Sequence, residues 1–388
     1  MIRQFKPNCC FNSLILEEHF KTLFGFNYEF PVDCINLINI YYLKLRKNHN
    51  LVSCSTEYSV IFTQNKLFNL GLNNFNNHYS MFNNNINKIN IDNVLSTSSS
   101  RHRSLILTSN GLYIYNRIYN NRCKINIDNV RSISIGEYDS LILTDEGLFI
   151  RSNQGPFPND NPACIVILKL KIKNVQSMKS GWYHHLILCN DELYGLGDNN
   201  FGQLRSRPTN TKYSLKHNGK YSFKPTNLNI KNVIDYSCGG NHSLAWCTDG
   251  LFGWGEIYKD LTNDLHKIDI DNILAISSGA KHNIVLTLDG IYGIGWNNYG
   301  QSGTNNFENS LIPQKIDLNI NINKISSINC GDYFTLIITE DDELYGFGCN
   351  NYGQLDKKSN SDKIIRIDMN GWTKSYYDNF MDYFKKLL

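Results

Sequence analysis

A short apolar motif returns eight times along the chain and limits the folds that the chain can adopt. The motif is a run of four residues such as Ser-Leu-Ile-Leu, and its copies begin at residues 13, 59, 104, 140, 185, 243, 283 and 335. Successive copies lie 46, 45, 36, 45, 58, 40 and 52 residues apart. A period of about 40 to 50 residues with several short strands in each unit is typical of β-propeller blades. The repeat therefore predicts an all-β protein in which similar sheets surround one axis.

The unit at residues 322–355 indicates how the strands follow one another. One apolar strand ends at a Cys-Gly pair, "FTLIIT" at 334–339 forms the next strand, and "LYGFG" at 344–348 forms a third. Short polar turns between short apolar runs predict antiparallel hairpins. Because the runs are continuously apolar, we expect strands that are covered on both faces, as in blades that pack face to face.

The glycine-rich stretch "LYGLGDNNFGQL" at 193–204 also has the spacing of a phosphate-binding loop, with Gly197 and Gly202 as its two glycines. Such a loop continues with Lys and then Ser or Thr, which contact the phosphates and the magnesium ion. Here the lysine position holds glutamine in three copies of the pattern, at Gln203, Gln301 and Gln354. A nucleotide site also occurs once in a domain. We therefore interpret the pattern as a structural repeat and expect no cofactor.

The glycines of this pattern have a predicted structural role. In "LYGFG", Tyr345 and Phe347 are expected on one face of the strand, and Gly346 and Gly348 on the other. Glycine on one face would let the backbone of the neighbouring blade approach closely. The Asn-Asn-Tyr-Gly run that follows suits a turn with positive φ, and we expect Gln354 to hydrogen-bond the backbone of that turn.

Two of the units resemble repeats of the regulator of chromosome condensation family. They are "SCGGNHSLAWCTDGLFGWGE" (237–256) and "SSGAKHNIVLTLDGIYGIGWNNYGQ" (277–301). The family pattern is Cys or Ser, Gly, two variable residues, His, Ser or Thr, and Leu, followed by Asp-Gly, by Tyr-x-x-Gly and by a Gly-Gln-Leu turn. The resemblance covers roughly residues 10 to 356 and implies a propeller, with seven blades as the family norm. The signatures of WD and kelch repeats do not recur.

The first four units depart from this pattern. "LFNLGLNNFNNH" has one glycine where two are expected, and "LYIYNR" and "LFIRSN" have none. Eight motifs stand against seven expected blades. The chain either forms eight blades, or its N-terminal hairpin shares one closing blade with the strand "KIIRIDM" at 363–369. A shared blade would leave no free sheet edge.

The histidine of the family pattern is present as His184, His242 and His282. Each comes at the same turn before the same strand, so we expect it to cap that turn by hydrogen bonding, and we expect neither catalysis nor metal binding from it. His185 doubles the first of them, but two adjacent histidines cannot easily present two ligands to one metal ion. No Gly-x-Ser-x-Gly motif occurs and no cysteine has a catalytic context. We therefore predict no metal site and no covalent chemistry.

Composition gives the broad class of the protein. The 388 residues are 41% hydrophobic and 19% charged, which fits a folded globular chain. A net charge of +3 does not by itself indicate nucleic acid as a partner. The eleven cysteines include no Cys-x-x-Cys pair, which predicts reduced thiols in the cytoplasm or nucleus. No apolar stretch has the length of a secretory signal core or of a transmembrane segment.

The longest step of the repeat contains a basic insertion at 205–224, "RSRPTNTKYSLKHNGKYSFK". It carries no acidic residue, and aromatic residues are interleaved with the basic ones. The predicted partner-binding residues are Arg205, Arg207, Lys212, Lys216, Lys220, Lys224, Tyr213 and Tyr221. Such a composition suits contacts with a nucleic-acid backbone and stacking on its bases, and it suits an acidic protein surface equally well. A disordered low-complexity loop is the third interpretation.

The predicted domain organisation is a propeller over residues 1–369 and a C-terminal helix over 370–388. In that last segment Trp372, Tyr376 and Phe380 follow helical spacing. The helix is expected to pack against the rim of the propeller or to anchor the protein to a partner or a membrane surface. A further irregular stretch, 151–164, is interpreted as an exposed Pro-rich connector.

Two functions follow from this interpretation. The first is a non-enzymatic platform whose loops bind another protein. The second is implied by the family resemblance: guanine nucleotide exchange on a Ran-like small GTPase, with chromatin or nucleic acid as a further partner. Exchange would need a wedge that projects from one face, and the insertion at 205–224 is its candidate. We expect a monomer.

Overall fold

The computed structural model describes residues 51–63, 66–71, 87–116, 121–153, 165–205, 221–256, 261–304, 306–318, 320–341, 343–355 and 361–367. The chain divides into two compact units, Met1–Asn50 and Leu51–Leu388, and every described residue belongs to the second. The first apolar motif, at residue 13, and the helix predicted at 370–388 therefore lie outside the described residues. Most of the connector at 151–164 does so as well.

The described residues of the second unit form seven four-stranded antiparallel sheets, and each takes its strands from one stretch of the chain in order. Blade 1 consists of β1 (Leu51–Cys54), β2 (Tyr58–Thr63), β3 (Lys66–Gly71) and β4 (Asn87–Ile89). Blade 2 consists of β5 (Val94–Ser99), β6 (Arg103–Thr108), β7 (Gly111–Asn116) and β8 (Asn121–Ile125). Blade 3 consists of β9 (Val130–Ile135), β10 (Asp139–Thr144), β11 (Gly147–Asn153) and β12 (Ile165–Lys169).

The remaining four blades follow the same plan. Blade 4 consists of β13 (Val175–Ser180), β14 (His184–Cys189), β15 (Glu192–Asp198) and β16 (Tyr221–Lys231). Blade 5 consists of β17 (Val233–Cys238), β18 (His242–Cys247), β19 (Gly250–Glu256) and β20 (Leu261–Ile268). Blade 6 consists of β21 (Ile273–Ser278), β22 (His282–Thr287), β23 (Gly290–Gly295) and β24 (Ser310–Ile316). Blade 7 consists of β25 (Ile325–Cys330), β26 (Phe334–Thr339), β27 (Leu344–Gly348) and β28 (Ser361–Ile367), with a 3-10 turn, η2 (Ile322–Lys324), before it.

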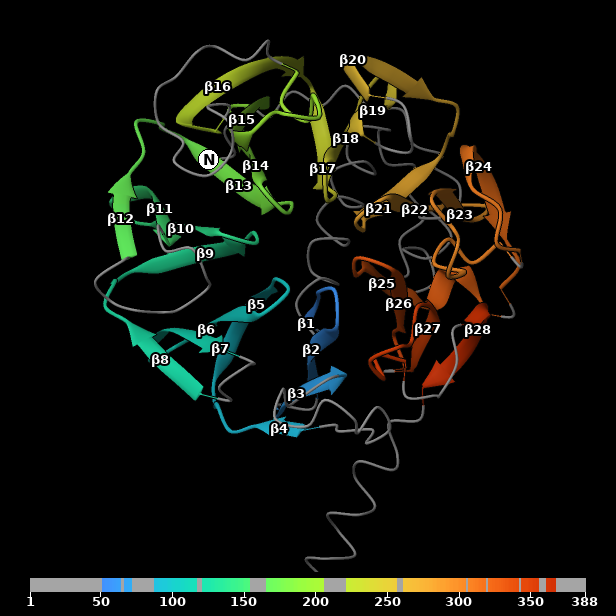
Figure 1. Ribbon diagram of the computed structural model, residues 1–388, viewed down its shortest axis with the longest axis horizontal. Coiled ribbons are helices and arrows are strands. Elements are labelled where there is room, and N and C mark those ends of the chain that lie inside the picture. Colours follow the sequence, from blue (N-terminus) through green and yellow to red (C-terminus); the bar gives the residue numbers. More distant parts are fainter. Residues whose placement is uncertain are drawn as a thin grey trace, which may run out of the picture. The chain divides into compact units, whose positions relative to one another are not determined.

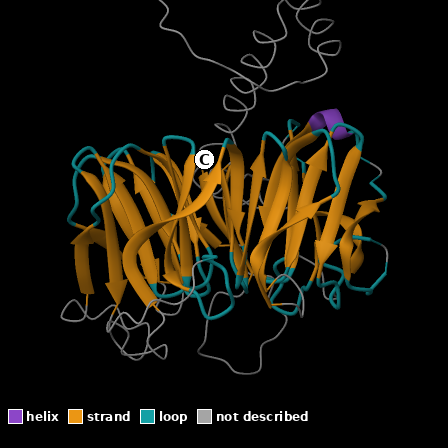
Figure 2. Cartoon of the chain, turned by 90° about the horizontal axis from the view of Figure 1, so that it is seen from above, coloured by secondary structure: helices purple, strands orange, loops and turns teal. Residues whose placement is uncertain are grey.

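The seven sheets form a closed ring around a central axis (Figure 1). The first strand of each blade lies innermost, and each inner strand contacts the inner strand of the next blade, including β25 of blade 7 with β1 of blade 1. The strands run between two faces of the ring, and the connections lie at these faces (Figure 2). The all-β propeller predicted from the repeat is therefore confirmed.

The described residues form seven blades, so the alternative of eight blades is wrong, and they show no closing blade shared with the N-terminal hairpin, whose residues lie outside the described part of the chain. Blade 7 takes all four of its strands from 325–367, and its outer strand β28 corresponds to the "KIIRIDM" segment. Within the described residues the ring therefore closes by packing of blade 7 against blade 1. The motifs from residue 59 onward each fall in the second strand of one blade, from β2 to β26.

The apolar second strands form the interior of the blades. All six residues of β6, β22 and β26 are buried. Clusters of buried side chains span neighbouring blades, as where Leu186 of blade 4 packs with Trp254 of blade 5. Continuous apolar runs thus indicate strands that are covered on both faces, as the sequence predicted.

The two glycines of "LYGFG" are enclosed by different neighbours. A Cβ at Gly348 would lie 3.0 Å from the Cα of Gln301 in blade 6, so at this position the neighbouring backbone does approach closely. A Cβ at Gly346 would instead meet the side chains of Leu355 and Leu336 at 2.6 and 3.0 Å, and both belong to blade 7. The expected approach of the next blade is therefore wrong for Gly346, whose lack of a side chain makes room for the core of its own blade.

The glutamine turns are built as the sequence predicted. The Oε1 atom of Gln354 accepts a hydrogen bond from the backbone of Tyr352 at 2.8 Å. Gln203 and Gln301 make the same contact in their own turns at 2.9 Å. Gln203 also serves the next blade, because its carbonyl accepts bonds from Trp254 at 2.8 Å and from Ser243 at 3.1 Å. The Gln203 turn thus links its own blade to the next one by hydrogen bonds.

The family histidines are structural, but they do not cap their own turn. The Nε2 atom of His184 lies 2.9 Å from the hydroxyl of Ser243, and that of His242 lies 2.7 Å from Oδ1 of Asn283. His282 contacts Thr335 in the same way at 3.1 Å. Each histidine therefore links its blade to the next one. Burial lowers the pKa of His184 and of His282 to about 3 and that of His242 to about 4, so all three are neutral.

Candidate functional site

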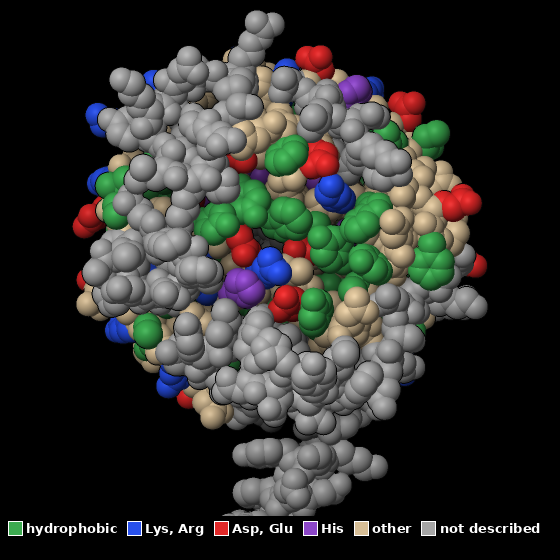
Figure 3. All heavy atoms as spheres, in the orientation of Figure 1, with side chains coloured by type: hydrophobic (Ala, Val, Ile, Leu, Met, Phe, Trp, Pro, Cys, Tyr) green, Lys and Arg blue, Asp and Glu red, His purple; other side chains and the backbone are tan. Residues whose placement is uncertain are grey.

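One face of the ring carries the turns that join the first and second strands of the blades, here named the A–B turns. They comprise residues 55–57, 100–102, 136–138, 181–183, 239–241, 279–281 and 331–333. Because the strands of a blade alternate in direction, the connections between third and fourth strands reach the same face. Hydrophobic side chains gather around the hollowed centre of the face in Figure 3, with Lys or Arg and Asp or Glu side chains among them. We name this centre the channel mouth.

Backbone hydrogen bonds tie successive A–B turns together. The amide of Glu137 donates to the carbonyl of Trp182 at 2.7 Å, and the amide of Gly240 donates to that of Ala280 at 3.0 Å. Ala280 in turn donates to the carbonyl of Asp332 at 3.0 Å, and Asp332 donates to that of Ser55 at 3.2 Å across the junction of blades 7 and 1. The turns therefore form a fixed frame for the side chains that they carry.

The carboxylate of Asp332 lies at the junction of three blades. Its Oδ1 atom accepts a bond from the indole of Trp182 in blade 4 at 2.9 Å, and its Oδ2 atom accepts one from the hydroxyl of Thr56 in blade 1. Burial raises the pKa of Asp332, while these two hydrogen bonds lower it. Trp182 and Asp332 are 150 residues apart in the sequence, and their contact crosses the mouth of the channel.

Glu137 of blade 3 is the second acid at the channel mouth. Burial, and after it the nearby charge of Asp332, raise the pKa of Glu137 to about 7. The charges of Arg101 and Arg103 and a hydrogen bond from the backbone amide of Arg101 act in the opposite direction. The guanidinium of Arg101 lies 3.8 Å from Glu57, which is itself buried. Arg103 is buried and donates to the carbonyl oxygen of Glu137 at 2.7 Å.

Two aromatic clusters flank these acids. In the first, the rings of Tyr138 and Tyr183 stack with centroids 5.3 Å apart and planes 20° from parallel, and Trp182 meets Tyr183 edge to face at 6.2 Å. The second cluster consists of Trp296, Tyr299 and Tyr333, whose centroids lie 5.5 to 5.8 Å from one another. All six rings are half-buried. Burial raises the pKa of both Tyr183 and Tyr333 to about 12, so their hydroxyls stay neutral.

The channel mouth opens into a cavity of about 120 Å³. Glu137, Trp182 and Asp332 line it together with the inner ends of the first strands. Its wall also holds three thiols, and burial raises the pKa of Cys54 and Cys238 to about 12 and that of Cys330 to about 11. Thiols with such pKa values are not nucleophiles at neutral pH.

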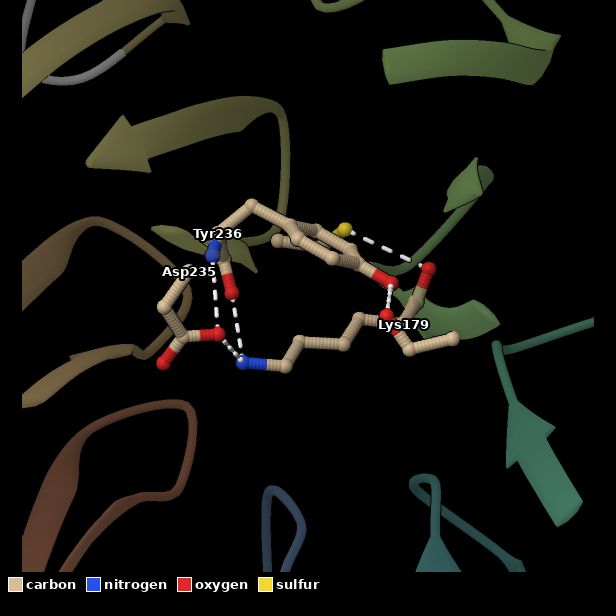
Figure 4. A network of polar contacts seen from close by, with 5 residues as sticks. Lys179, Asp235 and Tyr236 are labelled. Carbon is tan, nitrogen blue, oxygen red and sulfur yellow. Dashed lines mark hydrogen bonds and ion pairs between the residues drawn. The ribbon is translucent and has the colours of Figure 1, made fainter. Parts of the chain in front are cut away.

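A polar network lies deeper in the channel, between the inner strands of blades 4 and 5 (Figure 4). The ammonium of Lys179 donates to Oδ1 of Asp235 at 2.7 Å and to the carbonyl of Tyr236 at 2.6 Å. The hydroxyl of Tyr236 pairs with that of Ser177 at 2.8 Å, and the thiol of Cys238 donates to the carbonyl of Lys179 at 3.4 Å. The ammonium of Lys179 and the carboxylate of Asp235 pair with each other, so the network links blade 4 to blade 5.

Few of the predicted partner-binding residues fall within the described chain. Arg205 donates to the carbonyl of Leu228 at 2.9 Å inside blade 4 and is half-buried, and Lys224 is exposed on β16. Tyr221 begins β16. The others lie outside the described residues, namely Arg207, Lys212, Tyr213, Lys216 and Lys220. The chain leaves blade 4 after Arg205 and re-enters it at Tyr221, on the face that carries the channel mouth.

Sequence reasoning placed recognition in the insertion and did not single out the channel mouth. The residues of the mouth stand at the two variable positions between glycine and histidine in the repeat, as in Glu137-Tyr138, Trp182-Tyr183 and Asp332-Tyr333. Aromatic residues at the second of these positions in three units were the available signal. Within the described ranges no three His, Cys, Asp or Glu side chains gather into a group that could hold a metal ion. Among the same residues, no helix is long and apolar enough to cross a membrane.

Comparison with known proteins matches the sequence to repeat models of one family. Two models described as regulator of chromosome condensation (RCC1) repeat match the second half of the chain. One matches residues 273–301 and 325–354, and the other matches 190–246 and 289–338. These ranges lie within the regular units, from blade 4 to blade 7.

Similar proteins and structures agree with this match. The ultraviolet-B receptor UVR8 of Arabidopsis thaliana is 27% identical over 226 residues, which are 52% of this chain and 48% of the receptor. The chain thus spans about half the length of this relative. The structure of human WBSCR16 superposes with a TM-score of 0.59 at 19% identity, over 73% of this chain and 85% of that one. The structure of Prp20p from Saccharomyces cerevisiae superposes with a TM-score of 0.59 at 18% identity, over 75% of this chain and 83% of that one.

These two structures show that the fold is shared. The repeat models and the seven-bladed ring agree: the matched part of the chain consists of regulator of chromosome condensation repeats, which here form blades of a propeller.

Proposed function

We propose that the protein is a non-enzymatic platform that binds another protein through the channel mouth and the aromatic clusters around it. The observation that carries this proposal is the pair of half-buried clusters on a frame of cross-linked turns. Tyrosine and tryptophan are the residues that most often anchor protein interfaces, because they bury a large area at a low cost in side-chain entropy. A frame that is already fixed adds little ordering cost on binding.

The proposal is tested by capturing partners from extracts of the native cell with the full-length protein, followed by mass spectrometry. We expect Tyr183→Ala and Tyr333→Ala each to lose partners that the wild type retains, with Kd raised at least about tenfold for a purified partner. Tyr292→Ala is the matched control, because Tyr292 is also half-buried but bonds Asp289 of its own blade at 2.7 Å. Partners retained by both channel-mouth variants would contradict the proposal.

Nucleotide exchange is the second candidate function. The observation that favours it is the fold shared with Prp20p, a protein whose structure was described with its binding to Gsp1p and histones. In that case catalytic amounts of the protein should accelerate release of labelled GDP from a Ran-like GTPase. Deletion of residues 206–220 should abolish the effect if that segment supplies the wedge. No acceleration across a panel of small GTPases would remove this candidate.

The basic insertion remains a proposed partner-binding segment. If it contacts nucleic acid or chromatin, the affinity for DNA should fall steeply as salt is raised, because phosphate contacts release counterions. A flat salt response would leave an acidic protein surface as its target. We propose the cytoplasm or the nucleus as the compartment of the protein, because the described cysteines are free thiols.

A further inference from the structure

The charges of the channel mouth are not balanced. The A–B turns carry the acids Glu57, Glu137 and Asp332 and the bases Arg101 and Lys281. Lys281 is used elsewhere, because its ammonium lies 2.8 Å from Glu256 at the edge of the same face. Arg101 lies 3.8 Å from Glu57, with its side chain 53% exposed. Glu137 and Asp332 both line the cavity, where the charge of Asp332 raises the pKa of Glu137 and the charge of Arg101 lowers the pKa of both acids.

The wall of the cavity adds features that fit a cation with several donors. Trp182 lines it, and an aromatic ring beside carboxylates is a common surrounding for a guanidinium or an ammonium group. The hydroxyl oxygen of Ser278 also lies in this wall, and it is buried with no hydrogen-bond partner among the described residues. At about 120 Å³ the cavity has room for several water molecules, and thus for the head of one long side chain.

We propose that the channel mouth receives one cationic side chain, arginine or lysine, from the protein partner, between the carboxylates of Glu137 and Asp332 and against Trp182. The inference rests on the proposed function, since it names the group by which the partner is held. The aromatic clusters on either side would then contact the partner residues that flank the cation. An arginine can use its fork of donors on a carboxylate, whereas a lysine offers a point charge.

The test uses the full-length protein and three capped tripeptides, Ac-Ala-Arg-Ala-NH₂, Ac-Ala-Lys-Ala-NH₂ and Ac-Ala-Gln-Ala-NH₂, in saturation-transfer NMR. We expect at least one cationic peptide to bind and the neutral peptide not to bind. Glu137→Gln should weaken binding about tenfold, because a charge-assisted hydrogen bond is lost while the shape of the side chain is kept. Glu308→Gln, at an exposed carboxylate of blade 6, should leave binding unchanged.

The two cationic peptides identify the cation that the site prefers. Binding of the arginine peptide alone points to a guanidinium, and binding of the lysine peptide alone points to an ammonium. Absence of binding by both cationic peptides, or equal affinity for wild type and Glu137→Gln, overturns the proposal. Trp182→Phe provides a second variant, which keeps the ring and loses the donor to Asp332. Because these peptides bind without a partner, the cation site can fail while Tyr183→Ala and Tyr333→Ala still lose partners, so the two proposals fail separately.

Discussion

Blades 4 to 6 and blades 2 and 3 solve the same packing problem with different residues. At the start of the second strand, the regular blades place His184, His242 and His282, and the irregular blades place Arg103 and Asp139. The residue paired with this position on the third strand differs as well. It is Gly197, Gly255 and Gly295 in the regular blades, but Asn116 and Ser152 in the irregular ones.

The first residue of the second strand and its partner on the third strand therefore change together, and the reason is steric. At Gly197, with φ of 112°, an added Cβ would lie 2.4 Å from the carbonyl oxygen of Tyr183 and 2.9 Å from the Cα of His184. In blade 2, Asn116 and Arg103 are both buried, and Arg103 reaches the turn of blade 3 at 2.7 Å. A blade whose sequence pattern is eroded thus keeps its link to the next blade by a longer side chain. Loss of the repeat pattern does not mean loss of the blade.

The largest effect should come from breaking the glycine of a regular blade. We expect Gly197→Ala to lower the free energy of unfolding by about 3 kcal/mol, because the new Cβ meets backbone atoms at a positive φ. Asn116→Ala, at the matched position of blade 2, should cost about 1 kcal/mol, since a side chain is already accommodated there. Equilibrium denaturation in urea measures both. Equal costs would mean that the two positions are not structurally distinct.

The inter-blade hydrogen bonds of the three histidines should contribute unequally to stability. Phe334 fills the histidine position in blade 7 and is fully buried, so an aromatic ring without a donor fits there. We expect His242→Phe to cost about 2 kcal/mol, because the buried Oδ1 atom of Asn283 loses its donor. Thermal or urea unfolding of the purified variant gives this value.

The matched variants His184→Phe and His282→Phe should cost about 1 kcal/mol or less. Their partners, Ser243 and Thr335, still donate to the carbonyl oxygens of Gln203 and Gln301 at 3.1 and 3.0 Å. If His184→Phe lost more unfolding free energy than His242→Phe, the cost of losing a histidine would not depend on whether its former partner keeps another hydrogen bond.

The repeat allowed the ring, the second strand of every described blade and the glutamine turns to be predicted, because each depends on local pattern. The aromatic residues of the channel mouth recur at one position of the repeat, but the contacts across the mouth could not be predicted in this way. Trp182 and Asp332 meet only because the ring brings blade 4 opposite blade 7. The inter-blade role of His242 was also missed, because its partner Asn283 lies in the next unit, and only the packing of adjacent blades brings the two together. Contacts that depend on the curvature of the ring do not produce a periodic pattern in the sequence.

The same two regions should also respond oppositely to acid. Burial lowers the pKa of His184, His185 and His282 to about 3 and that of His242 to about 4, whereas an unfolded histidine titrates near about 6.5. Below about pH 6.5 the unfolded chain therefore binds protons that the folded blades 4 to 6 do not bind. The stability that these histidines allow is present above about pH 6.5 and is lost as the pH falls towards their folded pKa.

Blade 3 acts in the other direction. Burial raises the pKa of Glu137 to about 7 and that of Asp139 to about 6, while unfolded carboxyls titrate near about 4. The folded protein binds these protons first, so this contribution to stability is present at low pH and is lost as the pH rises through the folded pKa values. Burial also raises the pKa of Asp332 in blade 7, but four histidines still outnumber three carboxyls, so we expect the wild type to lose stability between pH 7 and pH 5.

Glu137→Gln separates the two contributions and should give the smallest effect. It removes a group that offsets the histidines, so the stability lost between pH 7 and pH 5 should grow, by about 1 kcal/mol after allowance for the partial exposure of this side chain. Glu308→Gln, at an exposed carboxyl, should leave the loss as it is in the wild type. Urea denaturation of the three proteins at both pH values gives the difference. A smaller loss in Glu137→Gln than in the wild type would mean that Glu137 is ionised across this range, and that the acids at the channel mouth do not repel each other.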